Sequence, residues 1–523
     1  MIGIFVESKK LYPSYIFKTF FDILGYPYKV INNISFKSNY DLLFYYGNNP
    51  QKINFRGKVI NIPEGNTKKT NEIYDKKNNS FKFDIIKESL EILSRKEEYN
   101  GKKDHHDRFI AENSSIYSEM AKPRLNKYLR VFEEIIEKHY KKQEQPLIKK
   151  VIWPGNKPFA VCLSHDVDAP YKYNFIGSLI IIKKSLNLLL ELKFFKFVNE
   201  FGKAFFCFFK KDDPYWQFNN IINLEKRYGF KSTFFFSINK KHKLDPNYSL
   251  SDSKIIKVIK AIHNSGWEIG LHLSYNSYEN KQHMLEEKKL LEKIIKNKIV
   301  GTRTHFLRFN TPNTWNSENY IFQYDTSLGY PDCIGYRNGL CYPYKPFDIV
   351  KDKELNIVEI PLNVMDGALS GKSKTLPKNC WKNLLNFYKS VKKMNGTLTL
   401  DWHQRYFFEN DFPGFKEIYK KSLDFFKKEN AFVGSCKQMN DWWDERNEVS
   451  FIKTEKEHRT TTWTLTSKYK INNLCFSISA VDKRCKLYTS KNASFKMIKR
   501  KSNILLKFKQ FPSKKNVIIK LTY

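Results

Sequence analysis

The sequence predicts an α/β protein built around a parallel, barrel-like sheet with helices, with a small α/β domain before it and a small β module after it. From residue 157 onward, short apolar runs recur with helical segments between several of them, a pattern typical of parallel sheets. Polar residues follow the ends of several runs, which is where barrel-like α/β folds place their chemistry. A chain of 523 residues is long enough for two or three domains.

Residues 1–150 are predicted to form the N-terminal α/β domain together with a helical extension. Strands are expected at Ile2–Val6, Lys29–Ile31, Asp41–Tyr46 and Lys58–Ile62, with a helix at Tyr15–Leu24. Residues 82–141 are charged and are predicted to be helical. A linker that contains Gln143–Pro146 and Trp153–Gly155 separates this domain from the barrel.

The predicted barrel occupies residues 157–445. Its strands are expected at Phe159–Leu163, Ser232–Ile238, Trp267–His272, Gly301–Phe309, Ile357–Val364, Thr397–Trp402 and Ala431–Gly434. Helices are expected at Ser253–His263, His283–Lys296 and Phe415–Lys428. Strands that alternate with helices usually pair in parallel, so their carboxyl ends meet at one edge of the sheet.

The tail, residues 446–523, is predicted to be a small antiparallel β module with a strongly basic surface. It contains 19 basic and four acidic residues. Apolar and polar residues alternate at Thr461–Thr466 and at Val517–Leu521, as in strands with one buried face. Two roles stay open, because such a module could hold an acidic glycan or serve only as an accessory sheet.

The formal net charge of +37 has two possible origins. Lys, Asn, Ile, Phe and Tyr are all used heavily, which an AT-rich coding genome would also produce. The other origin is an anionic partner, such as a membrane leaflet, an acidic glycan or nucleic acid. No nucleic-acid recognition motif accompanies the charge, so specific binding to nucleic acid is not expected.

Several features predict a cytoplasmic protein, with peripheral contact at the inner membrane face as an option. Residues 1–7 lack a basic segment before an apolar run and read as a strand, not as a signal peptide. The eight cysteines form no C-x-x-C pair and fit reduced thiols. One helical stripe contains Lys193, Lys196, Lys203 and Lys210. It suits either an interfacial helix on an anionic membrane or a packed helix with one solvated face.

The most informative stretch is Ser-His-Asp-Val-Asp at 164–168, directly after an apolar run. Side chains at i and i+2 of a strand point the same way, so Asp166 and Asp168 are expected on one side. Paired carboxylates suit a metal ligand beside a general base, although a surface turn is the alternative. Other polar residues stand at or near the ends of separate predicted strands: His272, His305, Arg308, Asp366 and His403.

These motifs resemble those of the NodB-type polysaccharide deacetylase superfamily. The shared order is the Asp pair, then Gly-Leu-His-Leu-Ser-Tyr-Asn at 270–276, then Leu-Asp-Trp-His at 400–403. A bacterial subgroup with an extra N-terminal α/β domain is similar at 305–309, 324–330 and 335–343 as well. The resemblance covers 157–445 closely and 1–150 more loosely, and it implies a distorted (β/α) barrel of the polysaccharide-deacetylase type.

The resemblance also implies roles for individual residues. Asp166 would be the general base, and Asp168 and His272 would bind a divalent metal, typically zinc, that polarises the acyl carbonyl. His403 would be the general acid that protonates the leaving amine. Arg303, Arg308 or Arg337 would orient a neighbouring acid or hold a substrate group. For Asp325 and Asp366, loop-ordering and substrate or supporting roles both stay open.

The sequence departs from the family pattern at Asn276, where a second histidine is usual. An amide oxygen is a poor substitute for imidazole at zinc, so His305 is the expected replacement ligand. Asn276 is left as a substrate-binding or supporting residue. His165 is expected to pack in the interior, and His105, His106 and His242 receive no role because their segments are charged.

The implied activity is metal-dependent removal of an acyl group, most simply N-acetyl, from a sugar during surface-polysaccharide or glycolipid synthesis. Without an export signal, the expected substrate is a lipid-linked or nucleotide-linked intermediate met at the cytoplasmic leaflet. The alternative is an inactive deacetylase-like scaffold that binds glycan or anionic membrane, which would be expected if Asn276 left the metal site incomplete.

Overall fold

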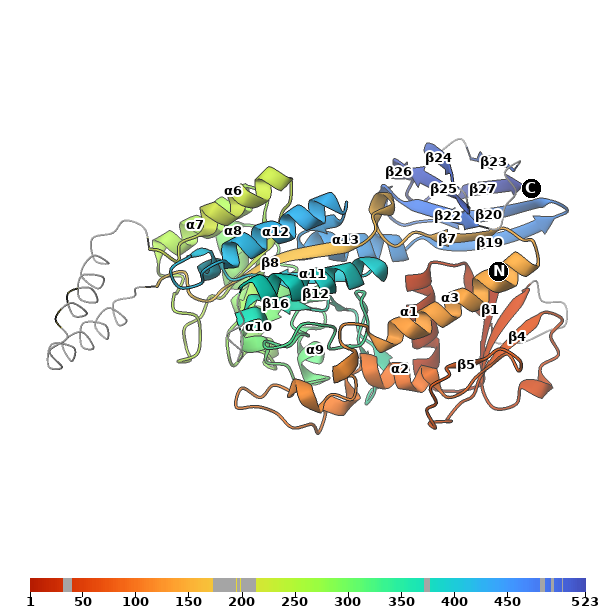
Figure 1. Cartoon of the computed structure of the whole chain (residues 1–523), viewed down its shortest axis with the longest axis horizontal. Coiled ribbons are helices and arrows are strands. Elements are labelled where there is room, and N and C mark those ends of the chain that lie inside the picture. The colour runs from red at the N-terminus through yellow and green to blue at the C-terminus, as the bar shows by residue number, and fades with distance from the viewer. Residues whose placement is uncertain are drawn as a thin grey trace.

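The computed structural model has a central parallel sheet, and the sheets formed by the N-terminal and the C-terminal residues both lie to the right of it in Figure 1. It describes residues 1–31, 40–172, 194, 198, 213–370, 377–479, 485–490, 493–500 and 502–523. The predicted lysine stripe at Lys193, Lys196, Lys203 and Lys210 lies outside the described residues. Within the described part of the chain, no helix combines the length and the hydropathy needed to span a membrane.

The N-terminal region forms a six-stranded sheet in the order β2-β1-β3-β4-β6-β5. Its strands are β1 (Ile2–Val6), β2 (Tyr28–Ile31), β3 (Leu42–Tyr46), β4 (Lys58–Ile62), β5 (Tyr74–Asp75) and β6 (Ser80–Phe81). Helices α1 (Tyr12–Leu24), α2 (Ile85–Leu93) and α3 (Arg124–Lys142) pack beside it (Figure 1). Aromatic stacking contributes to this packing, since the rings of Phe44 and Phe132 lie 4.8 Å apart.

The prediction that residues 82–141 are helical throughout is wrong between α2 and α3. Residues 94–123 contain only short 3₁₀ turns at Lys96–Glu98, Ala111–Asn113 and Tyr117–Glu119. Arg95 has a left-handed backbone with φ +52°, which ends the helical path, and Pro123 fixes the start of α3. A charged segment therefore runs over the barrel as an irregular loop.

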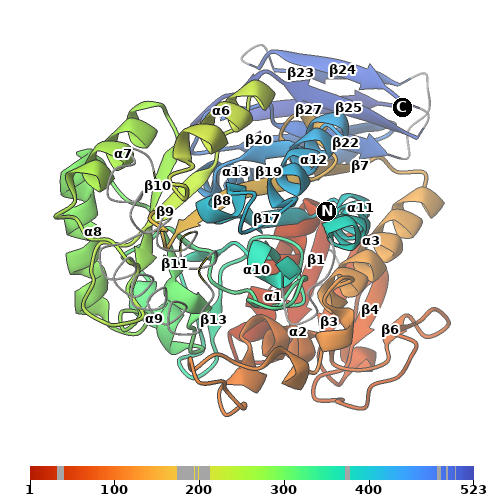
Figure 2. The ribbon, with the colours of Figure 1, turned by 60° about the vertical axis from the view of Figure 1, so that its left-hand side comes forward.

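The central sheet has the strand order β15-β12-β11-β10-β9-β8-β17-β16, and β18 also pairs with β8. Every pairing in it is parallel. Its strands are β8 (Ala160–Val167), β9 (Thr233–Phe236), β10 (Glu268–Leu273), β11 (Gly301–Thr304), β12 (Tyr324–Asp325), β15 (Val358–Glu359), β16 (Val364–Met365), β17 (Thr397–Asp401) and β18 (Phe432–Gly434). The sheet curls but is not closed, because β15 and β16 are its two ends (Figure 2). The predicted α/β fold with a distorted barrel is confirmed.

Helices cover the outer side of this sheet (Figure 2). They are α6 (Phe218–Tyr228), α7 (Ser253–Asn264), α8 (Lys281–Ile295), α11 (Pro377–Lys393), α12 (Phe415–Lys428) and α13 (Cys436–Asn447), with the short helices α9 (Asn313–Glu318) and α10 (Asp366–Ser370) in connecting segments. A small antiparallel pair is formed by β13 (Phe347–Asp348) and β14 (Lys353–Glu354). The core side chains of β8 and β9 are fully buried, as expected for strands covered on both faces.

Two predicted strands are interrupted. The run 301–309 is a strand only to Thr304, because Phe306 and Leu307 adopt left-handed backbone angles of φ +60° and +53°. The run 357–364 divides into β15 and β16 at opposite ends of the sheet. Pro361 lies between them, and a proline cannot donate the hydrogen bond that a continuous strand would need there.

The C-terminal residues form antiparallel sheets, as their alternation predicts. One sheet has the order β19-β20-β27-β23, another has β24-β25-β22-β7, and β21 pairs with β26. The strands are β7 (Leu147–Lys150), β19 (Ser450–Glu457), β20 (Thr460–Thr466), β21 (Ile471–Asn472), β22 (Cys475–Ser479), β23 (Lys486–Thr489), β24 (Phe495–Lys499), β25 (Asn503–Phe508), β26 (Gln510–Phe511) and β27 (Val517–Thr522). Strand β7 precedes the barrel in sequence yet pairs with β22, so the chain returns to this sheet after completing the barrel.

Candidate metal and catalytic site

The candidate site lies where four parallel strands of the central sheet end, namely β8, β10, β11 and β17. Asp166 is the penultimate residue of β8, and Asp168 directly follows that strand. His272 is near the end of β10, His305 follows β11, and His403 follows β17 after one residue. Parallel pairing brings the carboxyl ends of these strands to one edge of the sheet. Side chains separated by more than 200 residues therefore meet.

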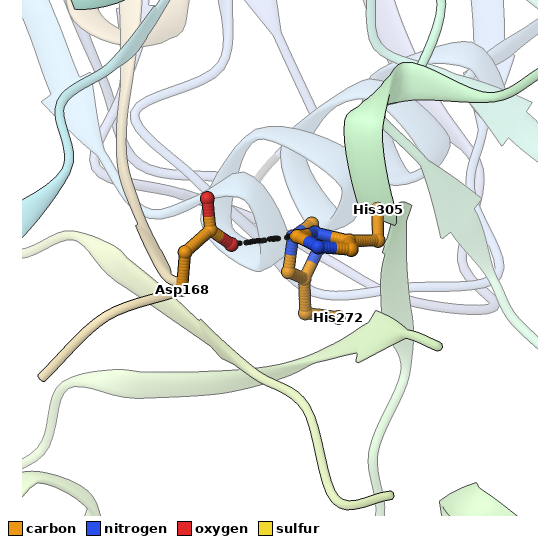
Figure 3. Close-up of side chains that lie close together, drawn as sticks. All are labelled: Asp168, His272 and His305. Carbon is orange, nitrogen blue, oxygen red and sulfur yellow. Dashed lines mark hydrogen bonds and ion pairs between the residues drawn. The ribbon is translucent and has the colours of Figure 1, made fainter. Parts of the chain in front are cut away.

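Asp168, His272 and His305 converge as a group that could hold a metal ion (Figure 3). The Oδ1 atom of Asp168 lies 3.2 Å from His272 Nε2 and 3.4 Å from His305 Nδ1, and the two ring nitrogens are 3.0 Å apart. Ligands at about 2.0–2.2 Å from a tetrahedral zinc ion would be separated by about 3.3–3.6 Å. The spacing of these atoms is close to what zinc requires.

Backbone carbonyl groups fix the orientation of both histidines. His272 Nδ1 donates to the carbonyl oxygen of Arg303 at 3.0 Å, and His305 Nε2 donates to that of Leu244 at 2.8 Å. A carbonyl can only accept, so in each neutral ring the other nitrogen presents a lone pair to the group. Asp168 Oδ1 is buried and has no hydrogen-bond partner among the described residues. Two lone pairs and a carboxylate facing one another favour a cation between them.

Asp166 is held by Arg303, which is on β11, three strands away from β8 in the sheet order. Arg303 Nη1 donates to Asp166 Oδ1 at 2.7 Å and to Asp401 Oδ1 at 2.9 Å. Burial raises the pKa of Asp166, but the positive charges of Arg303, His272 and His403 together outweigh burial and hold that pKa below its usual value. The other carboxylate oxygen of Asp166, Oδ2, faces away from Arg303 and lies 4.0 Å from His272 Nε2.

His403 is oriented by Asp366. Its Nδ1 lies 2.9 Å from Asp366 Oδ1, and its backbone N–H donates to Asp366 Oδ2 at 2.5 Å. Its Nε2 lies 3.1 Å from Asp168 Oδ2, which brings it to the edge of the Asp168–His272–His305 group. Burial lowers the pKa of His403, but the charges of Asp366 and Asp401 outweigh burial and raise that pKa well above its usual value.

Asn276 and Arg308 lie beside the group and not within it. Asn276 is exposed, and its Oδ1 accepts from Arg308 Nη1 at 3.3 Å. The guanidinium of Arg308 also donates to the carbonyl oxygens of His106 and Tyr275, at 3.0 and 2.5 Å. These contacts give Arg308 a structural connection to residues of the N-terminal region.

Asp325 and Arg337 are buried away from the metal-binding group. Asp325 accepts from the Ser327 hydroxyl, whose oxygen in turn accepts from the backbone N–H of Thr304, so it supports the end of β11. Arg337 Nη2 donates to Glu98 at 2.6 Å, which joins the barrel to the N-terminal region. His165 is enclosed as expected, because its ring nitrogens contact the Trp402 carbonyl and Glu225.

A family model described as a family of unknown function, DUF7033, matches residues 3–141. No curated protein is significantly similar to the chain in sequence. The structure of a protein from Mycobacterium smegmatis assigned as a polysaccharide deacetylase is similar, with 15% identity, 59% of this chain and 98% of that chain covered, and a TM-score of 0.39. The structure of the PuuE allantoinase is similar at 14% identity. The match covers 56% of this chain and 93% of that chain, with a TM-score of 0.39. The structure of a CE4 family pseudoenzyme from Bacillus anthracis is similar at 10% identity. The match covers 55% of this chain and 66% of that chain, with a TM-score of 0.29.

Sequence reasoning gave no role to Asp401, which the structure places between Asp166 and His403. Asp401 Oδ1 accepts from the backbone N–H of Asp166 at 3.1 Å, and Asp401 Oδ2 lies 3.7 Å from His403 Nδ1. Burial, with the nearby charge of Asp166, raises the pKa of Asp401 to about 7. A signal was present, because Asp401 and His403 repeat the i, i+2 spacing of Asp166 and Asp168 at the end of an adjacent strand.

Proposed function

We propose that the protein is a metal-dependent hydrolase that removes an acyl group, most simply N-acetyl, from a sugar. The observation that carries this proposal is the juxtaposition of three elements at one sheet edge. These are the Asp168–His272–His305 group, a carboxylate held by Arg303, and a histidine held by Asp366. Amide hydrolysis needs an electrophile for the carbonyl, a base for water and an acid for the amine.

Asp168, His272 and His305 would hold the metal, for which zinc suits one carboxylate oxygen and two imidazole nitrogens. When bound, a divalent ion polarises an acyl carbonyl and lowers the pKa of a water molecule. The two histidines are already aligned by the carbonyls of Arg303 and Leu244, so little rearrangement is required of them.

Asp166 is suited to accept the proton of the attacking water. Its depressed pKa keeps the carboxylate ionised at neutral pH, and Arg303 occupies Oδ1 so that Oδ2 remains directed to the metal-binding group. The contacts between Arg303 and three oxygen atoms, those of Ser164, Asp166 and Asp401, fix this orientation. Such positioning is the main contribution that a protein makes to a general base.

His403 is suited to protonate the leaving amine. Its raised pKa keeps the imidazolium protonated at neutral pH, and the Asp366 carboxylate at Nδ1 stabilises that charge. The proton on Nε2 is therefore the one available on the side of Asp168. Acid and base are thus different residues with pKa values moved in opposite directions, a division typical of acid–base catalysis.

We infer that the substrate is an acetylated sugar of surface-polysaccharide or glycolipid synthesis, carried on a lipid or a nucleotide in the cytoplasm. The net charge of +37 supports an anionic carrier such as a phosphorylated lipid. Association with an anionic membrane would weaken as salt increases. Retained association in high salt would count against this part of the proposal.

The test is acetate release from N-acetylated oligosaccharides by the full chain after dialysis against trace zinc. Asp166→Asn and His403→Ala should each lower kcat by about 10²- to 10⁴-fold without loss of folded protein. His305→Ala should lower the zinc content. His263→Ala is the matched control, because His263 is in the last turn of α7, close to the start of β10, whereas the candidate site lies where the strands end. Full activity in the Asp166 or His403 variant would contradict the assigned roles, and wild-type protein without metal would favour the binding-scaffold alternative.

A further inference from the structure

A loop of the N-terminal region lies against the barrel directly beside the metal-binding group. This segment, Lys103–Phe109, is called the histidine loop here, and it belongs to the stretch that the DUF7033 model matches. Arg108 Nη1 donates to the carbonyl oxygen of Phe306 at 3.2 Å, and Phe306 is the residue that follows His305. In Figure 1 the orange chain of the N-terminal region lies against the green barrel near α9.

The histidine loop is held in one shape by its own side chains. Asp104 Oδ1 accepts from the backbone N–H groups of His106 and Arg108 at 2.9 and 3.0 Å. Asp104 Oδ2 accepts from Nε and Nη2 of Arg108, a two-point ion pair. A bridge between Lys103 and Phe109 joins the two ends of the loop. Such a loop can present His106 in a fixed position.

Arg308 fastens the histidine loop to the barrel. Its guanidinium lies over the rings of Tyr275 and Tyr278 at 4.1 and 4.2 Å and donates to the carbonyl oxygen of His106. Tyr278 adds a second connection by donating to Asp107 Oδ2 at 2.7 Å. Together these contacts fix a part of the N-terminal region relative to His305.

Four rings meet at this contact, and they are called the ring wall here: His106, His242, Tyr275 and Phe306. Phe306 is 4.5 Å from His305 and 4.4 Å from His106, measured between ring centroids. The His242 ring stacks on Tyr275 at 4.7 Å, and His106 Nδ1 is 3.1 Å from Tyr275 Oη. The wall therefore begins at a metal-binding histidine and continues outward onto the N-terminal region.

The ring wall is partly open to solvent and is held in place by a strained backbone. His106, His242 and Phe306 are half-buried, whereas Tyr275 is buried behind them. Phe306 and Leu307 are consecutive non-glycine residues with φ of +60° and +53°. Strain of this kind persists where the surrounding contacts require it, and it is concentrated at functional sites. Here it turns the chain so that Phe306 faces the histidine loop.

We propose that the ring wall binds a sugar ring of an N-acetylhexosamine oligosaccharide, next to the sugar that carries the reacting acyl group. This inference rests on the proposed function. A pyranose has an apolar C–H face that packs on aromatic rings, and ligand sites combine such surfaces with a few polar groups. The ring nitrogens of His106 and His242 and the Tyr275 hydroxyl supply polar groups for sugar hydroxyls. The N-terminal region would then determine which glycans the barrel accepts.

The test compares the affinity of the zinc-loaded full chain for N-acetylglucosamine and for its β-1,4-linked tetramer, by titration calorimetry. The tetramer should bind more tightly, because only it can occupy the ring wall and the reacting position together. Phe306→Ala and His106→Ala should each weaken tetramer binding about three- to tenfold and leave monomer binding unchanged. Phe306→Tyr should retain the affinity, since it keeps the ring, and His263→Ala is again the control.

Unchanged tetramer affinity in both alanine variants would overturn the inference, and so would equal wild-type affinity for monomer and tetramer or binding of neither. Zinc content and thermal unfolding of each variant show whether a loss of affinity reflects a lost fold. Acetate release from the tetramer reports separately on the proposed function. Tetramer binding that depends on the rings, without acetate release, would contradict the proposed activity and support the ring wall. Acetate release together with tetramer binding that does not depend on the rings would contradict the ring wall and support the proposed activity.

Discussion

Arg303 joins the two carboxylates of the candidate site and determines how both are charged. It is fully buried, and its Nη1 contacts Asp166 and Asp401 within 3 Å. The pKa of Asp166 is held low and that of Asp401 is raised to about 7, although both are buried beside the same cation. Asp401 is the less stabilised of the two because it also faces the Asp166 charge. Of the two carboxylates, Asp401 is therefore the one that takes up a proton first as the pH decreases.

Replacement of Arg303 with Gln should move the acidic limb of the pH–rate profile to higher pH. The guanidinium lowers the pKa of Asp166, so its removal raises that pKa and leaves the base protonated at pH values where the wild type is active. The variant should also unfold more easily, by about 3–5 kcal/mol, because buried carboxylates lose their cation. The measurement is kcat/KM from pH 5 to 9. An unshifted limb would show that Arg303 does not tune the base.

At the residue scale, the sequence was sufficient to group Asp168, His272 and His305 but not to place the arginines. The histidines could be predicted because each stands at the end of a parallel strand, and strand order alone brings those ends together. The contacts of Arg308 and Arg337 depend on His106 and Glu98, which lie in a region more than 200 residues away. No local pattern indicates such pairs, so these contacts could not be predicted.

At the scale of single elements, strand β7 is held against α13 by a buried lysine. Lys150 Nζ donates to the carbonyl oxygens of Arg446 and Val449 at 3.4 and 2.9 Å. Burial, with the nearby charge of Arg446, lowers the pKa of Lys150 to about 8. Asp22 and Glu448 are the negative charges that oppose this shift.

Wild-type stability relative to Lys150→Met should increase as pH increases from 8 to 10. The folded protein releases the Lys150 proton near pH 8, whereas the unfolded chain keeps it to about pH 10.5, so raising the pH in this window favours the folded state. The gain should approach about 2 kcal/mol at pH 9.5. Urea unfolding of both proteins at pH 7 and 9.5 measures it. A difference between the two proteins that does not change with pH would place the pKa of Lys150 outside this window.

Elements could be predicted from the sequence where the hydrophobic periodicity was uninterrupted. The predictions were wrong where the backbone conformation of single residues determined the structure. The helices α7, α8 and α12 begin and end within two residues of the predicted positions. The end of β11 could not be predicted, because nothing in the type of Phe306 or Leu307 indicates a left-handed backbone. The prediction for the segment 94–123 was wrong for a related reason, since contacts such as the buried ion pair of Arg95 with Glu98 hold this segment in an irregular path.

At the scale of the whole molecule, the three parts of the chain are joined by specific contacts. Strand β7 leaves the N-terminal region and pairs with β22, so the chain before the barrel and the chain after it share one sheet. The sequence could not reveal this, because pairing between strands more than 300 residues apart leaves no local pattern. Sequence did reveal the antiparallel character of the tail, since alternation of apolar and polar residues is a local property. The division of the chain into domains at 150 and 446 stays a prediction.

Two ion pairs that differ in burial cross the contact between the N-terminal region and the barrel. Glu98 and Arg337 are almost completely buried and 2.6 Å apart, whereas Lys18 and Glu354 are 2.7 Å apart and partly exposed. Glu98→Gln leaves Arg337 as a buried cation without its carboxylate partner and leaves Arg95 paired with Glu97 alone, so it should lower the free energy of unfolding by about 3–5 kcal/mol. Glu354→Gln should change it by about 1 kcal/mol or less.

Because the pKa of Glu98 is held below its usual value, this contribution is present at neutral pH and should be lost as pH decreases through that lowered pKa. Chemical unfolding of both variants at pH 7 measures the contrast. Equal, small effects would mean that the N-terminal region is attached to the barrel without depending on Glu98. A large effect confined to Glu98→Gln would mean that the region which carries the histidine loop is positioned by a buried charge, and that loss of this charge should also weaken glycan binding at the ring wall.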